Sequence, residues 1–326
     1  MNTNTKYLGL DVSSPIVVGS SGLTNSVDNL LAMEAAGAGA VVLKSIYEEQ
    51  IIFDIKRSMN VVAPTDQYGK SYEYIAANGS DDRLRRYFDF VAEAKSQLHI
   101  PVIGSIDCYS FENWITYASR FQEAGCDGLE LNLAILPYET STSAEDVDRL
   151  FNNVIQTLKK SVTIPISIKV SPYFTDMAKY MQQLSWTGVS SITLFNKPLN
   201  IDINIDSMSI EPAPTISHPD DLYNTLRWVA ILSKKLRCEV SASTGVHTAA
   251  DVVKMLLAGA QTVQVSSALY KNGIDYIKDL SEGLGQWMNA KGFASIDDFR
   301  GLLAFTSNGE AFMQLRTHCM KYLADL

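Results

Sequence analysis

Short apolar runs alternate with amphipathic stretches along almost the whole chain. Eight of the runs resemble buried strands, at residues 15–19, 40–44, 102–105, 128–133, 166–170, 191–195, 239–242 and 262–265. Between them lie stretches with the period of a helix, at residues 27–36, 82–97, 111–124, 144–160, 176–184, 220–235, 249–258 and 276–288. Apolar strands that alternate with amphipathic helices are typical of a parallel sheet with helical crossovers.

Eight strand–helix units predict an α/β fold of the closed (β/α)8 TIM barrel type rather than an open sheet. A chain of 326 residues has the length of one such barrel with insertions. No linker, repeat or low-complexity tract divides it, so we expect a single domain over residues 1–326. Ser143 and Thr248 each stand just before a predicted helix and are expected to cap it.

Two connections are too long to be simple turns, and we interpret them as insertions after the second and sixth strands. They run over residues 45–80 and 196–219. Both follow strand C-termini, where barrel enzymes build their active sites. The second contains a strict apolar–polar alternation at 201–206, which predicts a small antiparallel ribbon with one apolar face. This ribbon is either an ornament on the barrel, a dimer contact or a wall of the active site.

Composition narrows the range of partners and locations. The net charge is −9 and no basic patch interleaved with aromatic residues is present, so nucleic-acid binding is not expected. No run approaches the ~18 apolar residues of a membrane span. The first residues lack the apolar segment of a signal peptide, which favours a cytoplasmic protein. The four cysteines are widely spaced and the four histidines scattered, so we expect reduced thiols and no metal site.

Lysines at two strand ends indicate a ligand site. Lys169 ends the apolar run at 166–170, and Lys44 ends the run at 40–44. A lysine is rarely buried without a partner, because desolvating an ammonium group is costly. Small residues follow the last two strands, at 241–246 and 265–268, and would let backbone N–H groups approach a phosphate. Together these features predict a phosphorylated cofactor whose electron-rich head lies near both lysines.

These features together resemble those of a known enzyme family. The chain resembles the class 1 dihydroorotate dehydrogenases, which are FMN-containing (β/α)8 barrels, over nearly its whole length. Besides the region of Asn196, the matching segments are PIVVGSSG at 15–22, GAGAVVLKS at 37–45, ELNL at 130–133, IKVSPYF at 168–174, LAGAQTVQV at 257–265 and MNAKGFASIDDF at 288–299. The resemblance implies bound FMN, a homodimer, a separate electron acceptor and a place in pyrimidine biosynthesis.

The resemblance also implies roles for individual residues. Lys44 would lie close to both flavin and substrate, and Asn132 and Asn196 would hydrogen-bond to flavin or substrate. Lys169 would face the N1/O2 edge of the flavin, where a fixed cation stabilises the negative charge of the reduced form. The remaining cofactor residues would line the flavin ring through their backbone (Ser20, Ser21, Gly22) or hold the phosphate (Thr244, Gly245, Ser266, Ser267).

The substrate half of the family's pattern is altered in this chain. In the family, ELNL continues into Ser-Cys-Pro-Asn, whose Cys removes a proton from the substrate, but here Ile135 stands in that stretch. Isoleucine cannot accept a proton. The family's substrate loop is replaced by YEYIAAN at 72–78. Substitutes for the missing base could come from Cys108, at the end of the third strand, or from Glu139, Thr140 and Ser141.

Four interpretations follow. The leading one is an FMN-dependent oxidoreductase that oxidises a small molecule by hydride transfer to flavin. A second is a true dihydroorotate dehydrogenase with a relocated base. A third is a barrel lyase or aldolase that uses Lys169 as a Schiff-base amine. The fourth is a flavin-binding redox protein without catalysis.

Overall fold

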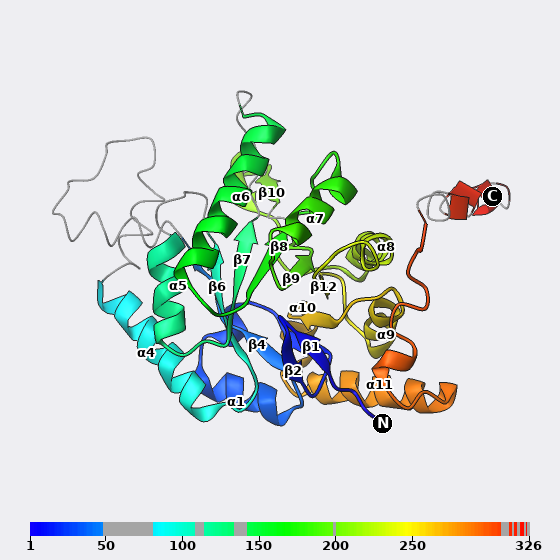
Figure 1. The fold of residues 1–326 in the computed structure, drawn as a ribbon, viewed down its shortest axis with the longest axis horizontal. Helices are drawn as coiled ribbons and strands as arrows, with labels where there is room; N and C mark the ends of the chain where they lie inside the picture. The colour runs from blue at the N-terminus through cyan, green and yellow to red at the C-terminus, as the bar shows by residue number, and fades with distance from the viewer. Residues whose placement is uncertain are drawn as a thin grey trace.

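The computed structural model describes residues 1–47, 81–107, 114–133, 142–197 and 200–307, with scattered residues between 313 and 324. Eight parallel strands surround a central axis, and helices cover the outside of the barrel (Figure 1). The barrel strands are β3 (Ile16–Val18), β4 (Ala40–Val42), β6 (Val102–Asp107), β7 (Gly128–Leu133), β8 (Ile166–Val170), β9 (Ser191–Leu194), β12 (Glu239–Ser243) and β13 (Thr262–Val265). Pairing of β4 with β6 closes the barrel. The predicted (β/α)8 fold is therefore confirmed.

Each of the eight predicted helices is present within a few residues of its expected bounds. They are α1 (Val27–Ala35), α4 (Asp81–Gln97), α5 (Trp114–Glu123), α6 (Ala144–Ser161), α7 (Met177–Trp186), α8 (Leu222–Leu232), α9 (Ala249–Leu257) and α11 (Tyr276–Lys291). Ser143 and Thr248 both accept a hydrogen bond from the backbone N–H three residues later, so both predicted caps are confirmed. The apolar face of each helix packs on the barrel because its residues recur every three or four positions.

Several short elements were not apparent from the sequence. A hairpin of β1 (Thr5–Tyr7) and β2 (Leu10–Val12) precedes the barrel. It packs its apolar residues against Val17, Val42 and Ile103 of the barrel. Strands of three residues are too short to show a period, which explains the omission. The others are β5 (Ile46–Tyr47), the helix α10 (Ser267–Asn272) and three 3₁₀ turns, η1 (Gly22–Thr24), η2 (Pro219–Asp221) and η3 (Ile296–Asp298).

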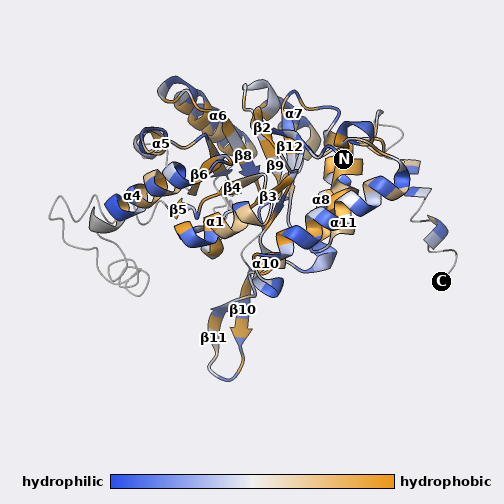
Figure 2. Ribbon diagram, turned by 90° about the horizontal axis from the view of Figure 1, so that it is seen from below, coloured by the Kyte–Doolittle hydropathy of each residue, from blue (hydrophilic) through white to orange (hydrophobic). Residues whose placement is uncertain are grey.

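The ribbon expected after the sixth barrel strand is an antiparallel hairpin of β10 (Ile201–Asn204) and β11 (Ser209–Pro212). It projects away from the barrel (Figure 2). Ile203 pairs with Ile210, and their side chains are 62% and 71% exposed. The hairpin therefore has one apolar face that nothing in the described chain covers. Of the other long connection, the structure describes only β5, since residues 48–80 lie outside the described ranges.

Within these same ranges, no helix combines the length and the apolar character that crossing a membrane would require.

Candidate active site

The C-terminal ends of the barrel strands surround a pocket of about 490 Å³. Parallel strands place these ends on one side of the barrel, so side chains from distant parts of the sequence meet there. Every residue to which the sequence assigned a cofactor or substrate role within the described ranges lies in the lining: Ser20, Ser21, Gly22, Lys44, Asn132, Lys169, Asn196, Thr244, Gly245, Ser266 and Ser267. The structure brings these residues together, while their roles remain predictions.

Lys169 is held at the bottom of the pocket by two polar side chains. Its ammonium group donates a hydrogen bond of 2.8 Å to Gln264 Oε1 and lies 3.5 Å from Glu130 Oε1. Lys169 is 8% exposed and Glu130 is completely buried. A charge buried to this extent requires an opposite charge and hydrogen bonds to offset its desolvation. The position of the lysine ammonium is therefore set by the barrel interior rather than by solvent.

Glu130 is itself fixed by hydrogen bonds from three other elements. Its Oε2 accepts hydrogen bonds from Gln264 Nε2 at 2.6 Å, Thr193 Oγ1 at 3.0 Å and the Tyr7 hydroxyl at 3.4 Å. Burial, together with the charge of Glu130, raises the pKa of Tyr7 well above its usual range, so its hydroxyl keeps its proton. The N-terminal hairpin thus contributes a donor to the network below the pocket.

Lys44 lines the same pocket, two residues beyond the end of β4. Its ammonium group is 4.2 Å from the centroid of the Tyr47 ring, a cation–π distance. The backbone carbonyl of Lys44 accepts a hydrogen bond of 2.6 Å from the Tyr87 hydroxyl. Beside it, Ser20, Ser45 and Ser105 are linked through their hydroxyl groups at 3.0 and 2.8 Å. These contacts tie the loops after β3 and β4 to the third barrel strand, β6.

The loop after β12 approaches the pocket in a strained conformation. Thr244 has φ +79° and Gly245 has φ +82°, a region that a β-branched residue rarely adopts. Thr244 is held there by a hydrogen bond of 2.9 Å from its hydroxyl to the Phe195 carbonyl. A Cβ at Gly245 would lie 2.1 Å from Leu222 N, so only glycine fits. Backbone in such conformations often forms the walls of ligand sites.

The loop after β13 completes this side of the pocket. Ser266 donates a hydrogen bond of 3.0 Å to the Gly19 carbonyl, and Ser267 accepts one of 2.9 Å from Ser217 N. At the rim, Lys197 donates a hydrogen bond of 2.8 Å to Asp221. Burial raises the pKa of Asp221, but the Lys197 and His218 hydrogen bonds outweigh it and leave this pKa below its usual value. Small side chains therefore gather at the loops where barrels commonly bind phosphate.

The proposed replacements for the missing base lie outside the described residues. These are Cys108, Glu139, Thr140 and Ser141. Ile135, which stands where the family has its base, and the altered substrate loop at 72–78 also lie outside the described residues. The pocket nevertheless contains polar residues that the sequence did not single out, namely Glu130, Gln264 and Asp107. Glu130 and Gln264 interrupt apolar strands and Asp107 ends one, and a charged or amide side chain at such a position was the available signal.

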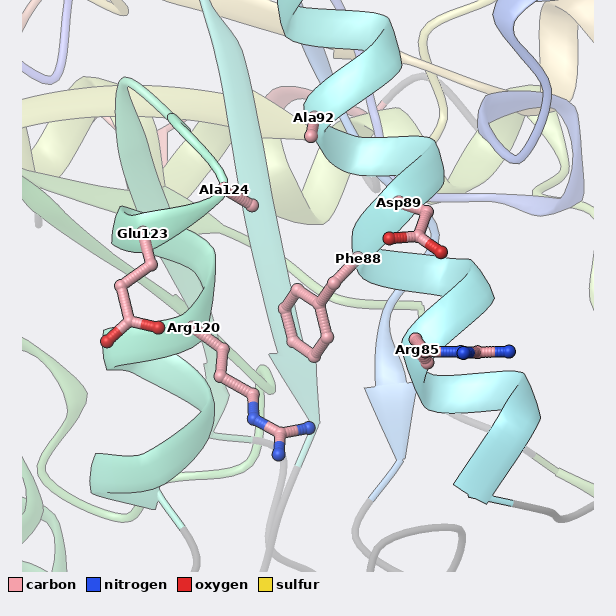
Figure 3. A pocket seen from close by; sticks show the side chains of 7 residues that line it. All are labelled: Arg85, Phe88, Asp89, Ala92, Arg120, Glu123 and Ala124. Carbon is pink, nitrogen blue, oxygen red and sulfur yellow. The ribbon is translucent and has the colours of Figure 1, made fainter.

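A second hollow lies on the outer surface between α4 and α5 (Figure 3). Phe88 points between the two helices, and the Arg120 guanidinium carbon lies 5.8 Å from its ring centroid. This hollow is separate from the strand ends and shares no residue with the pocket at the barrel mouth. We therefore place the candidate active site in the barrel mouth.

Comparisons with known proteins identify dehydrogenases as relatives of this chain. A family model described as dihydroorotate dehydrogenase matches residues 2–288. The dihydroorotate dehydrogenase B (NAD(+)) catalytic subunit of Thermoplasma acidophilum is 26% identical over 304 residues, covering 92% of this chain and 98% of that protein. Dihydroorotate dehydrogenase A (fumarate) of Lactococcus lactis is 26% identical over 322 residues, covering 92% and 98%. The chloroplastic dihydropyrimidine dehydrogenase (NADP(+)) of Arabidopsis thaliana is 23% identical over 321 residues, covering 90% and 75%.

Proposed function

The chain belongs to the dihydroorotate dehydrogenase family, and we propose on this basis that it is an FMN-dependent oxidoreductase. Its donor would be a small molecule that loses two hydrogens from adjacent carbons. The observation that carries the proposal is the buried Lys169 ammonium, held at the bottom of a pocket whose far side consists of small-residue loops. A cation beside the flavin ring would tune its electronics, and a loop of small residues would hold the phosphate of a mononucleotide.

The residues present fit this cofactor. The pocket volume of about 490 Å³ lies within the range of ~300–1,000 Å³ that is usual for cofactor sites. Asn132 Oδ1 is buried and accepts no hydrogen bond from the described part of the chain. This oxygen could therefore accept a hydrogen bond from a bound ligand. Thr244, Gly245, Ser266 and Ser267 would hold the phosphate, while Ser20, Ser21 and Gly22 would line the ring.

The protein's contribution to the reaction is electrostatic and steric. Bound FMN would supply an acceptor for two electrons. Lys169 would stabilise the negative charge that develops on the cofactor, because its ammonium is held in place before the reaction begins. Lys44, Asn132 and Asn196 would orient the donor between the flavin and the pocket wall. The serine chain from Ser20 to Ser105 would keep the wall beside Lys44 rigid.

The alternative of a Schiff-base lyase finds less support. Schiff-base formation requires the unprotonated amine. The Lys169 nitrogen is engaged by Glu130 and by Gln264 Oε1, so it is not positioned to attack a substrate carbonyl. The same geometry is compatible with a flavin-binding redox protein that does not turn over, and only kinetics separates that protein from an enzyme.

We further propose a homodimer, a cytoplasmic location and a separate electron acceptor. The dimer would form through the β10–β11 hairpin, whose isoleucines are exposed on one face. An apolar patch rimmed by polar residues commonly marks a contact between proteins.

One sequence of measurements tests the function. The absorbance spectrum of the pure protein should show the bands of a bound flavin, and mass spectrometry of the released ligand should give FMN. FAD, or failure to bind any flavin after reconstitution, would refute the proposal. Anaerobic mixing with candidate donors then distinguishes an enzyme from a flavoprotein without turnover, because only an enzyme bleaches the flavin.

A further inference from the structure

The buried carboxylate of Glu130 is held from one side only. Its Oε2 accepts hydrogen bonds from Gln264 Nε2 at 2.6 Å, Thr193 Oγ1 at 3.0 Å and the Tyr7 hydroxyl at 3.4 Å. Its Oε1 accepts no hydrogen bond from the described part of the chain and lies 3.5 Å from the Lys169 ammonium. Glu130 belongs to β7, while these donors come from β13, β9 and β1. The position of the carboxylate is therefore set by elements that only barrel closure brings together.

The ion pair between Lys169 and Glu130 is longer than a directly hydrogen-bonded one. An ammonium and a carboxylate in direct contact are separated by ~2.7–2.9 Å, and the Lys95–Asp127 pair of this chain has that spacing, at 2.7 Å. Lys169 Nζ lies 3.5 Å from Glu130 Oε1 and donates a hydrogen bond of 2.8 Å to the neutral amide oxygen of Gln264 instead. The donors on Glu130 Oε2 thus keep the carboxylate back from the ammonium. Less of the lysine charge is therefore cancelled than in a direct contact.

Tyr7 reaches this carboxylate from the N-terminal hairpin. Its side chain is completely buried, and its oxygen accepts a hydrogen bond of 3.0 Å from Gln264 Nε2 while its hydroxyl donates to Glu130. Burial, together with the charge of Glu130, keeps the pKa of Tyr7 well above its usual range, so the donor is retained. The turn of the hairpin is tied to the barrel by a hydrogen bond of 3.1 Å from Gly9 N to Glu239 Oε1. The Tyr7 hydroxyl is therefore a fixed donor beneath the pocket.

We propose that Tyr7 and Thr193 are positioning residues whose hydroxyls hold Glu130 away from Lys169 and thereby raise the midpoint potential of the bound flavin. The proposal rests on the proposed function and extends the role of Lys169 to the residues beneath it. The two hydroxyls act through Glu130, because neither residue belongs to the described lining of the pocket. Their two effects have the same sign: the hydrogen bonds stabilise the negative charge of the carboxylate, and they keep that charge further from the ammonium. Both effects leave more of the positive charge to stabilise the reduced flavin.

Two substitutions test the proposal, since each removes one hydroxyl and keeps the shape of the side chain. In the FMN-loaded protein, Tyr7→Phe and Thr193→Val should each lower the equilibrium constant for two-electron reduction at least threefold, which is about 14 mV in midpoint potential. The potentials are measured anaerobically against a reference dye, and absorbance gives the flavin content. Tyr276→Phe is the matched control, because it removes a hydroxyl that donates to the His247 carbonyl at 3.1 Å, outside this network. It should leave the potential unchanged.

A second background shows whether the hydroxyls act through the charge of Glu130. In the Glu130→Gln protein both shifts should disappear, since no carboxylate charge remains to be held away from Lys169. A loss of packing alone would shift the potential equally in both backgrounds.

The proposal is overturned if Tyr7→Phe or Thr193→Val keeps the wild-type potential or raises it, or if the shifts persist in Glu130→Gln. If one of these variants does not fold, the other decides by itself. Absence of bound flavin would refute the proposed function, whereas bound flavin with unshifted potentials refutes this proposal alone.

Discussion

Replacing Lys169 by methionine should weaken both the fold and the electron affinity of the flavin. The substitution keeps most of the length of the side chain but leaves the carboxylate of Glu130 completely buried without its cation. At the observed 3.5 Å and an effective dielectric constant of ~20, the attraction lost is about 5 kcal/mol. Removing one partner of a buried pair typically costs ~3–5 kcal/mol, which agrees with this figure.

Substituting Glu130, the other member of the ion pair, makes the test specific to the pair. Glu130→Gln removes the negative charge but can keep hydrogen bonds to Gln264 and Thr193, so Lys169 alone remains charged. The double variant carries neither charge and should be more stable than either single variant, because two neutral groups replace an uncompensated ion. Thermal unfolding of the FMN-free protein measures this cycle. Additive effects of the two substitutions would show that the pair is not coupled.

The midpoint potential of the bound flavin should shift in opposite directions in Lys169→Met and Glu130→Gln. Loss of the cation should lower the midpoint potential by ~30–60 mV, which corresponds to roughly 1.4–2.8 kcal/mol for two electrons. Glu130→Gln should raise the potential, since the lysine charge is no longer compensated. Lys278→Met removes an exposed ammonium paired with Asp275 and should alter neither readout. Equal potentials in wild type and Lys169→Met, with flavin fully bound, would refute the role given to this lysine.

Three further outcomes are expected. Dihydroorotate should reduce the flavin poorly, because Ile135 cannot accept a proton, and flavin bleaching within a second of stopped-flow mixing would contradict this. Light scattering should give a dimer for wild type and a monomer for the hairpin variant Ile203→Asp/Ile210→Asp. A monomeric wild type would contradict the proposed dimer contact through the apolar face of the hairpin. Burial lowers the pKa of His247 below 6.5, so the neutral ring stabilises the fold above about pH 6.5 and this contribution is lost as the pH falls through the lower folded pKa. His247→Gln should therefore show a smaller fall in melting temperature between pH 7.5 and 5.5 than wild type, whereas equal falls would exclude the histidine as the cause.

The local pattern of apolar and polar residues was sufficient to predict the barrel. The bounds of β7, β8 and β13 coincide with the apolar runs at 128–133, 166–170 and 262–265, because a strand buried on both faces leaves a continuous apolar signal. The same reasoning located the pocket. Once strands and helices alternate, all strand C-termini lie at one end, so Lys44 and Lys169 had to approach the same space.

Tertiary structure alone decided how those residues are used. Gln264 and Glu130 are 134 positions apart, yet a hydrogen bond of 2.6 Å joins them beneath the pocket, and Tyr7 reaches them from a hairpin too short to show a period. The orientation of Asn132 likewise depends on Asp107 from the neighbouring strand. Sequence periodicity reports which face of an element is buried, because burial is a property of each segment. Which donor meets which acceptor depends on strand register and barrel closure, and these arise only when distant segments pack together.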